Sequence, residues 1–260
     1  MFHQSFTNVL NSSNNKKIYF LSDFHLGAPN AEVSLIREKK IIQFLDEIKQ
    51  DAEQIFIVGD LFDFWYEYKK VVPRGYVRIL GKLAELTDSG ILIHFFVGNH
   101  DMWMNDYFQK ELNIPVYFEP KTFQFNNKKF MIGHGDGLGP GDGGYKFLKK
   151  IFRNKFCQWL FGVLPSSVGI GIAHYFSNKS RSREDSNIEV FLGEENEWLL
   201  IYSKEVLQKE HFDYFIFGHR HLPIDFKLNE NSRYINLGEW INYNSYAVFD
   251  GNTLELKYYK

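Results

Sequence analysis

The sequence has little that would suit a secreted or membrane-embedded protein. Its single cysteine, Cys157, excludes a disulfide within the chain and favours a reducing compartment. No uninterrupted apolar run reaches the roughly 18 residues that read as a membrane-spanning helix. The first residues do not combine a basic segment with an apolar one, so we expect no signal peptide. A net charge of −2 names no partner, and the cytoplasm is the expected location.

Acidic residues are missing from residues 143–183, a stretch that holds eight Lys or Arg residues. Apolar side chains recur within it at helical spacing: Leu148, Ile151, Phe152, Phe156, Trp159, Leu160 and Val163. We predict a helical insertion over residues 143–200, within a single domain that spans residues 1–260. This insertion would form a lid over the open end of the remaining structure.

The rest of the chain predicts an α/β fold with two β-sheets. Strands expected at 18–22, 54–58 and 91–97 alternate with helices at 31–50 and 75–88, which indicates parallel strands. The second half predicts a further strand and three hairpins, at 213–217, 121–132, 224–237 and 246–259. We therefore expect a two-sheet β-sandwich flanked by helices, with antiparallel strands contributed by the second half.

Polar clusters follow five of the predicted strands, usually beside a glycine. Their candidate ligands are Asp23, His25, Asp60, Asn99, His134, His219 and His221. Ligands of open α/β sheets gather at the carboxyl ends of strands, so these side chains should converge. Each cluster alone is more often a polar turn, and an isolated strand histidine such as His94 is more often a core residue. The whole series predicts a metal site.

The residue types indicate which metals this site would hold. Aspartate, histidine and asparagine without cysteine suit a borderline-hard divalent cation, with Mn²⁺ the first choice and Fe²⁺ or Zn²⁺ as alternatives. Seven ligands exceed the need of one ion, so we expect two ions that share a carboxylate. Two such ions clamp the attacking and leaving oxygens of a phosphoryl displacement.

The blocks SDFHLG, GDLFDFW, GNHD, GHGD and GHRH resemble the five signature blocks of calcineurin-like metallophosphoesterases. The resemblance implies that Asp60 bridges two ions. One would be held by Asp23, His25 and His221, and the other by Asn99, His134 and His219. It also implies that the catalytic residue His100 contacts phosphate while Asp101 orients it. Asp63 either positions a ligand or ends a turn.

Several blocks are similar to the UDP-2,3-diacylglucosamine hydrolases (pyrophosphatases) of lipid A biosynthesis. They are GDLF-x-x-W, the segment after His134, and an LG-x-W block near the C-terminus. The resemblance implies hydrolysis of the diphosphate to UMP and 2,3-diacylglucosamine 1-phosphate. It also implies substrate contacts from Asn99, Asp142, Tyr145, Lys179, Arg181 and Arg183. The basic, apolar insertion would hold acyl chains and bring the protein into peripheral contact with an anionic inner membrane.

Three alternatives stay open. The best-known hydrolases have Arg at the position of His100, so a generic phosphoesterase acting on a nucleotide or phosphoprotein is one of them. A non-catalytic scaffold of the same fold is another, and the apolar stripe of the insertion could instead simply pack on the sandwich. We expect no nucleic-acid partner, because the stripe is in helical register rather than a set of stacking aromatics on a strand.

Overall fold

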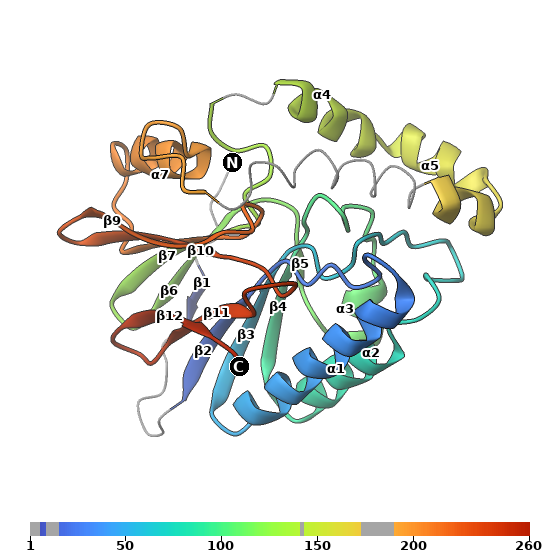
Figure 1. Ribbon diagram of the computed structural model, residues 1–260, viewed down its shortest axis with the longest axis horizontal. Helices are drawn as coiled ribbons and strands as arrows, with labels where there is room; N and C mark the ends of the chain where they lie inside the picture. The colour runs from blue at the N-terminus through green and yellow to red at the C-terminus, as the bar shows by residue number, and fades with distance from the viewer. Residues whose placement is uncertain (1–5, 9–15, 141–142, 173–189) are drawn as a thin grey trace.

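The computed structural model describes residues 6–8, 16–140, 143–172 and 190–260. Its described strands form two six-stranded sheets, which lie against each other with helices outside (Figure 1). The two-sheet α/β fold that we predicted is confirmed.

The first sheet has the strand order β12-β11-β2-β3-β4-β5. Its strands are β2 (Lys17–Leu21), β3 (Ala52–Val58), β4 (Leu92–Phe96), β5 (Val116–Tyr117), β11 (Ser245–Phe249) and β12 (Leu254–Tyr258). The strands β2 to β5 are parallel, as the alternation of strands and helices predicted, and β11 joins β2 in antiparallel register. Parallel strands place their carboxyl ends at one edge of this sheet.

The second sheet has the order β1-β6-β7-β8-β10-β9. Its strands are β1 (Phe6–Asn8), β6 (Lys121–Phe125), β7 (Lys128–Ile132), β8 (Tyr214–Phe217), β9 (Pro223–Asn229) and β10 (Ser232–Leu237). All three predicted hairpins form. The second half thus contributes antiparallel strands, as predicted, and β8 in addition pairs in parallel with both β7 and β10. Hairpin turns are local signals, whereas β8 reaches its neighbours through long connections.

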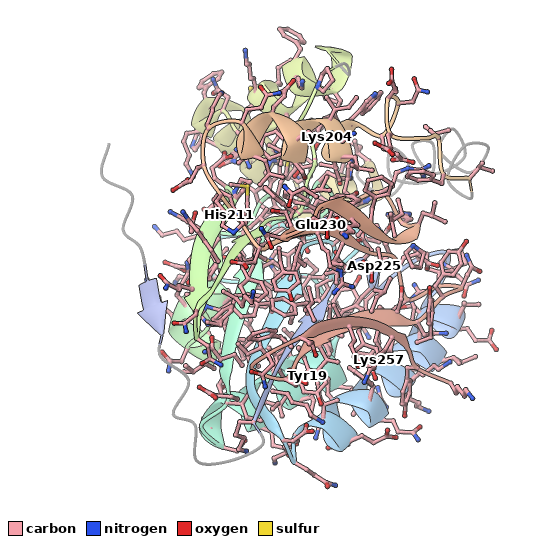
Figure 2. The ribbon with its side chains drawn as sticks, turned by 90° about the vertical axis from the view of Figure 1, so that its left-hand side faces the viewer. Tyr19, Lys204, His211, Asp225, Glu230 and Lys257 are labelled. Carbon is pink, nitrogen blue, oxygen red and sulfur yellow. The ribbon has the colours of Figure 1, made fainter. Side chains whose placement is uncertain are left out.

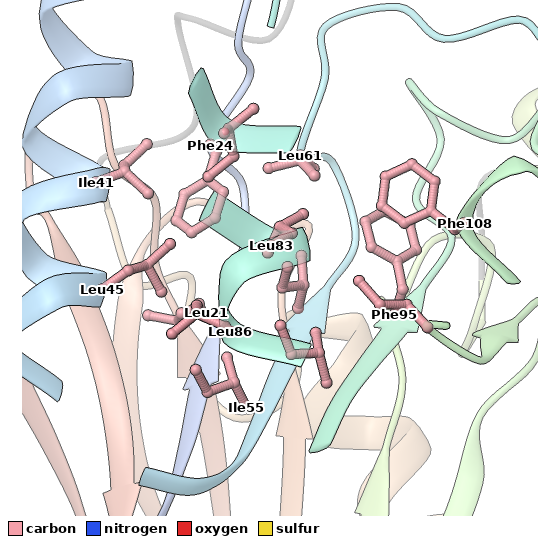
Figure 3. Packing of buried hydrophobic residues seen from close by; sticks show 14 of the residues in the cluster. Leu21, Phe24, Ile41, Leu45, Ile55, Leu61, Leu83, Leu86, Phe95 and Phe108 are labelled. Carbon is pink, nitrogen blue, oxygen red and sulfur yellow. The ribbon is translucent and has the colours of Figure 1, made fainter. Parts of the chain in front are cut away.

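Three helices cover the outer face of the first sheet, namely α1 (Ala31–Ile48), α2 (Val77–Asp88) and α3 (Tyr107–Leu112). The side chain of Asn30 accepts a hydrogen bond from the Val33 amide and so caps α1, as the sequence indicated. Figure 3 shows Ile41 and Leu45 of α1 packing with Leu83 and Leu86 of α2 above Ile55 of the sheet. This cluster fixes the strand ends relative to the helices.

Two further cores complete the layers. Between the sheets, phenylalanines dominate, among them Phe20, Phe56, Phe96, Phe123 and Phe130. Helix α7 (Trp198–Leu207) packs Leu199 and Leu200 on the outer face of the second sheet. Charged side chains such as Lys204, Asp225 and Glu230 cover this side of the molecule (Figure 2).

The insertion contains α4 (Gly143–Phe152) and α5 (Lys155–Val163), which lie beyond the open end of the sheets (Figure 1). Within their described residues neither helix has a buried side chain. Phe156, Trp159 and Val163 are 67%, 62% and 63% exposed, so the alternative in which the stripe only packs on the sandwich is wrong for these residues. Phe152 and Phe161 do pack, against Trp103. No helix in the described ranges is long and apolar enough to span a bilayer.

Candidate metal centre

Five loops that follow β2, β3, β4, β7 and β8 bring the seven predicted ligands together. We call the group Asp23, His25 and His221 site 1. Nε2 of His221 lies 3.1 Å from Oδ1 of Asp23 and 3.1 Å from Nε2 of His25. Nε2 of His25 lies 3.8 Å from Oδ2 of Asp60.

The remaining ligands gather on the other side of Asp60, and we call Asn99, His134 and His219 site 2. Oδ1 of Asn99 lies 3.0 Å from Nε2 of His134 and 2.9 Å from Nδ1 of His219. Nε2 of His134 in turn lies 3.3 Å from the same Oδ2 of Asp60. Donor atoms bound at about 2.1 Å to one cation lie roughly 3.0–3.4 Å from one another, so most of these spacings match a shared coordination shell.

The hydrogen bonds of the carboxylates also fit two cations. The amide of His219 and the hydroxyl of Ser22 donate to Oδ2 of Asp23, and the amide of His100 donates to Oδ1 of Asp60. The opposite oxygens, Oδ1 of Asp23 and Oδ2 of Asp60, are buried and accept no hydrogen bond from the described part of the chain. A buried carboxylate oxygen without a donor is costly, and a cation removes that cost. These two oxygens are the ones that face the imidazoles.

The backbone at the ligands is strained. Asp23, His25, Asp60, His219 and His221 all have left-handed backbones, with φ between 45° and 65°. Such conformations cost a non-glycine residue about 1 kcal/mol or more each and concentrate at functional sites. Five of the nine non-glycine residues described with positive φ are therefore candidate ligands.

Two glycines let the loops approach each other. A Cβ added at Gly98 would lie 2.1 Å from Oδ1 of Asp60, and one at Gly59 would lie 2.3 Å from Nδ1 of His134. Neither position has room for a side chain. Close packing of the loops thus explains why glycine precedes the polar clusters at these two positions.

Electrostatics indicate a demand for positive charge. Burial acts to lower the pKa of His25, but Asp23, Asp63 and Asp60 raise it to about 10. Burial likewise opposes a proton on His134, whose pKa is raised to about 10 chiefly by Asp60. The pKa of Asp60 falls below its usual range, because the surrounding imidazoles outweigh its burial. The carboxylates thus favour protons on His25 and His134, whereas burial and the neighbouring His134 lower the pKa of His219 to about 4. Divalent cations would supply the positive charge that the carboxylates favour.

His100 and Asp101 lie beside the two sites. Nδ1 of His100 lies 3.0 Å from the carbonyl oxygen of Asp63, and its ring contacts that of His25 edge to face. The Asp101 carboxylate accepts hydrogen bonds from the amides of Gly98 and Leu61, at 2.8 and 2.9 Å. Asp101 therefore supports the loops that carry Asp60 and Asn99, whereas the group next to the His100 ring is Asp63.

Asp63 is the residue whose place the sequence left open. Its Oδ1 lies 3.8 Å from Nδ1 of His25 and 3.7 Å from Nδ1 of His100, and it is buried. It faces two imidazoles rather than merely ending a turn. Its position three residues after Asp60 was the available signal.

Contacts tie the start of the insertion to site 2. The hydroxyl of Tyr145 donates to Asp136 at 2.7 Å, and Nζ of Lys149 lies 2.5 Å from the same carboxylate. Asp136 follows the candidate ligand His134 by two residues, and the Tyr145 ring lies 6.3 Å from that of His219. Of the predicted substrate-contacting residues, Asn99 and Tyr145 are thus at the site. Asp142, Lys179, Arg181 and Arg183 lie outside the described residues.

The end of the insertion is tied to the centre as well. Arg220, between the candidate ligands His219 and His221, donates to the carboxylate of Glu197 from Nε at 3.1 Å and from a terminal nitrogen at 3.3 Å. It also donates to the carbonyl oxygen of Val190. Glu197 is buried and accepts a further hydrogen bond from the Leu192 amide. The sequence does not reveal this pair, because no local pattern links residues 23 positions apart.

Comparison with known proteins agrees with this geometry. Residues 16–223 match the family model described as calcineurin-like phosphoesterase. The chain is 40% identical to the UDP-2,3-diacylglucosamine hydrolase of Porphyromonas gingivalis over 93% of this chain and 97% of that protein. It is 28% identical to the UDP-2,3-diacylglucosamine hydrolase of Haemophilus influenzae, over 90% and 95% of the two chains. Together with the donor groups, the family match indicates a dinuclear divalent metal site.

Among solved structures, Vps29 from Entamoeba histolytica in complex with Zn²⁺ gives a TM-score of 0.45 at 13% identity. The match covers 92% of this chain and 89% of that one. A likeness this distant has no bearing on the chemistry of the site.

Proposed function

Because this chain belongs to the calcineurin-like phosphoesterases, we propose that it hydrolyses the diphosphate bond of UDP-2,3-diacylglucosamine. The products are UMP and 2,3-diacylglucosamine 1-phosphate. The observation that carries the proposal is the Oδ2 atom of Asp60, which lies between the donors of site 1 and site 2. The names of the two relatives supply the substrate.

The seven ligands would hold two Mn²⁺ ions, with Asp60 shared and Fe²⁺ or Zn²⁺ as alternatives. Bound there, such ions polarise a phosphoryl oxygen and lower the pKa of water towards neutrality. Asn99 and His100 would lie beside the phosphate. In the reaction, an oxygen from water forms a bond to the α-phosphorus and the bond from that phosphorus to the bridging oxygen breaks. The sugar 1-phosphate leaves with the bridging oxygen.

His100 is placed to interact with the substrate through Nε2. With Nδ1 directed at the Asp63 carbonyl, the hydrogen bond fixes Nδ1 as the protonated nitrogen of the neutral ring. Nε2 is then the nitrogen that would meet a phosphate oxygen or the departing group, and it donates a hydrogen bond to either of them in the imidazolium form, in which both ring nitrogens carry a proton. His100 would act as the catalytic residue and Asp101 would hold the Gly98 and Leu61 backbone in place.

The insertion suits the lipid portion of this substrate. Exposed apolar side chains of α4 and α5 lie beside Lys146, Lys149, Lys150, Arg153 and Lys155. Acyl chains need apolar surface, and a diphosphate or an anionic bilayer attracts the cations. We assign to this surface the acyl chains and a peripheral contact with the cytoplasmic side of an inner membrane. Asp142, Lys179, Arg181 and Arg183 complete the proposed substrate contacts.

Turnover by the purified protein with Mn²⁺ tests the proposal. UDP-2,3-diacylglucosamine should be cleaved to UMP, whereas UDP-N-acetylglucosamine, which has the same diphosphate without the two acyl chains, should be cleaved far more slowly. The variant Asp60→Asn should lose turnover, and Asp88→Asn, at an exposed acid on α2, should keep it. Equal or faster cleavage of simple nucleotide phosphodiesters would favour the generic phosphoesterase instead.

A further inference from the structure

The buried face of α1 changes from apolar to polar towards the metal centre. Ile41, Phe44, Leu45 and Ile48 on this face belong to the hydrophobic core. The preceding positions of the same stripe, at helical spacing, are Ser34, Arg37 and Glu38, and each of them is only 6% exposed. Burying polar groups is unfavourable unless they are hydrogen-bonded, so their partners indicate what they do.

Two of these side chains bind the backbone of the loop that carries the first ligands of site 1. A terminal nitrogen of Arg37 donates to the carbonyl oxygens of His25 and Ala28, at 2.6 and 2.5 Å. The hydroxyl of Ser34 accepts from the amide of Gly27 at 2.7 Å. Residues 25–28 are therefore bound on three main-chain atoms by one face of one helix.

The third side chain joins α1 to its neighbour. Oε1 of Glu38 accepts a hydrogen bond from the amide of Ile79, in the first turn of α2, at 3.0 Å. Because Ile41 and Phe44 anchor the following turns in the core, α1 is a rigid support for the loop. Arg37 therefore acts from a fixed position.

The loop needs such a support, since its backbone is strained where the ligands are. Asp23 and His25 have φ values of 55° and 45°, which L-residues rarely adopt. A carbonyl oxygen that is held by a charged donor restrains the peptide plane that follows its residue. At His25 this restraint acts on the residue whose imidazole faces Asp23 and His221.

We propose that Arg37 is a positioning residue for the metal centre, which holds the His25 and Ala28 carbonyls so that Asp23 and His25 keep the geometry of site 1. The inference rests on the proposed ligand set. Asn99, His134 and His219 of site 2 follow β4, β7 and β8 rather than the loop that α1 binds. Loss of Arg37 should therefore weaken the binding of one of the two ions far more than that of the other.

Mn²⁺ titration of the metal-free, full-length protein tests this proposal. The unmodified chain should bind two ions. Arg37→Met keeps the length of the side chain but removes its hydrogen-bond donors. It should lower the affinity for one ion by about 10- to 100-fold, as is usual when a residue that supports metal ligands is replaced. The affinity of Arg37→Lys for that ion should lie between those of the unmodified chain and Arg37→Met. Lys39→Met, at an exposed position of the same helix, is the charge-matched control and should bind as the unmodified protein does.

A second readout separates positioning from a general loss of folding. At saturating Mn²⁺ the kcat of Arg37→Met should recover towards that of the unmodified protein, because the variant lacks metal rather than structure. Ser34→Ala, a milder change, should weaken the same ion to a smaller extent. Unchanged affinities in both variants, or equal weakening of both ions with no recovery, would overturn the proposal. Binding of fewer than two ions by the unmodified chain would overturn the proposed ligand set and this inference with it.

Discussion

The carbonyl oxygen of Asp63 lies 3.0 Å from Nδ1 of His100, while the Asp63 carboxylate lies 3.8 Å from Nδ1 of His25. One residue thus contacts the imidazole proposed to meet the substrate and approaches an imidazole proposed to bind metal. Both histidines thus face the same turn after β3. Substitutions around this turn can therefore cause two distinguishable losses, one of turnover and one of bound metal.

Replacement of His100 should impair turnover without loss of metal. His100→Gln should lower kcat by about 100-fold or more, the range for loss of a proton-transfer group. Mn²⁺ content, measured on the purified variant, should stay at the unmodified level, because His100 is outside both ligand groups. His211→Gln, at a histidine whose side chain is 58% exposed, is the control and should leave kcat unchanged. Metal loss in His100→Gln would show that the residue is a ligand.

Two glycines should respond to alanine in opposite ways. At Gly98 the new Cβ would meet Oδ1 of Asp60 at 2.1 Å, so Gly98→Ala should displace the shared carboxylate and abolish turnover. Gly81 lies inside α2, and nothing lies within 4 Å of the position that an added methyl group would take, so Gly81→Ala should raise the free energy of unfolding by about 0.5–1 kcal/mol. Chemical denaturation and turnover of both variants check this. A Gly98→Ala protein with normal turnover would contradict the described approach of the two loops.

His94 should make the fold sensitive to mild acid. Burial lowers its pKa from the usual 6.5 to about 4, and its ring nitrogens lie 3.2 Å from Gln54 and Tyr117, as expected for a core histidine. The folded chain disfavours the protonated form of His94. The contribution of neutral His94 to the free energy of unfolding is therefore complete above pH 6.5 and is lost as the pH falls towards 4. That loss amounts to on the order of 2–3 kcal/mol of unfolding free energy.

The comparison of His94 with His94→Gln isolates this effect. Glutamine retains hydrogen-bonding groups but does not titrate, so the variant should lose less stability between pH 6.5 and 4. Denaturant unfolding at several pH values gives the difference, in which the titration of the metal ligands cancels. Parallel pH profiles would mean that His94 accepts a proton without cost.

The exposed face of α5 should matter only for an acylated substrate. Trp159→Ser removes an aromatic side chain that is 62% exposed. It should raise KM for UDP-2,3-diacylglucosamine by about tenfold, because acyl contacts are lost. Slow turnover of UDP-N-acetylglucosamine should not change, and stability should shift by no more than about 0.5 kcal/mol. Leu92→Ser, at a comparably exposed position at the start of β4, serves as the control.

The strand ends were the most predictable part of the molecule. Each candidate ligand follows an apolar run and a turn signal, so Asp23, Asp60 and His134 could be placed at one edge from local patterns alone. Helix α1 was predictable for a similar reason, since Asn30 and the apolar stripe mark its start and face. The helix predicted over about residues 31–50 ends at Ile48 in the structure, with Lys49 as its C-cap.

Short or non-local elements were not predictable. Strands β1 and β5 have three and two residues, too few for any periodicity. The six-residue helix α3 has the same difficulty. The partners of Arg37 and Arg220 depend on which loops meet in space. For these residues the sequence shows a charge, and the structure shows that the charge is bound to main-chain carbonyls or to Glu197.

The anchoring of the insertion at both ends determines how it could be exchanged between related enzymes. A chimera that grafts a foreign insertion between β7 and β8 would have to carry partners for Asp136 and Arg220. Without them, the loops with His134 and His219 would lose the contacts that hold them to the insertion. Junctions placed between Asp136 and Tyr145, and between Glu197 and Arg220, would transfer half of each contact and leave the other half behind. A graft that keeps Tyr145 and Lys149 with Asp136, and Glu197 with Arg220, is the one expected to change acyl preference while retaining both metals.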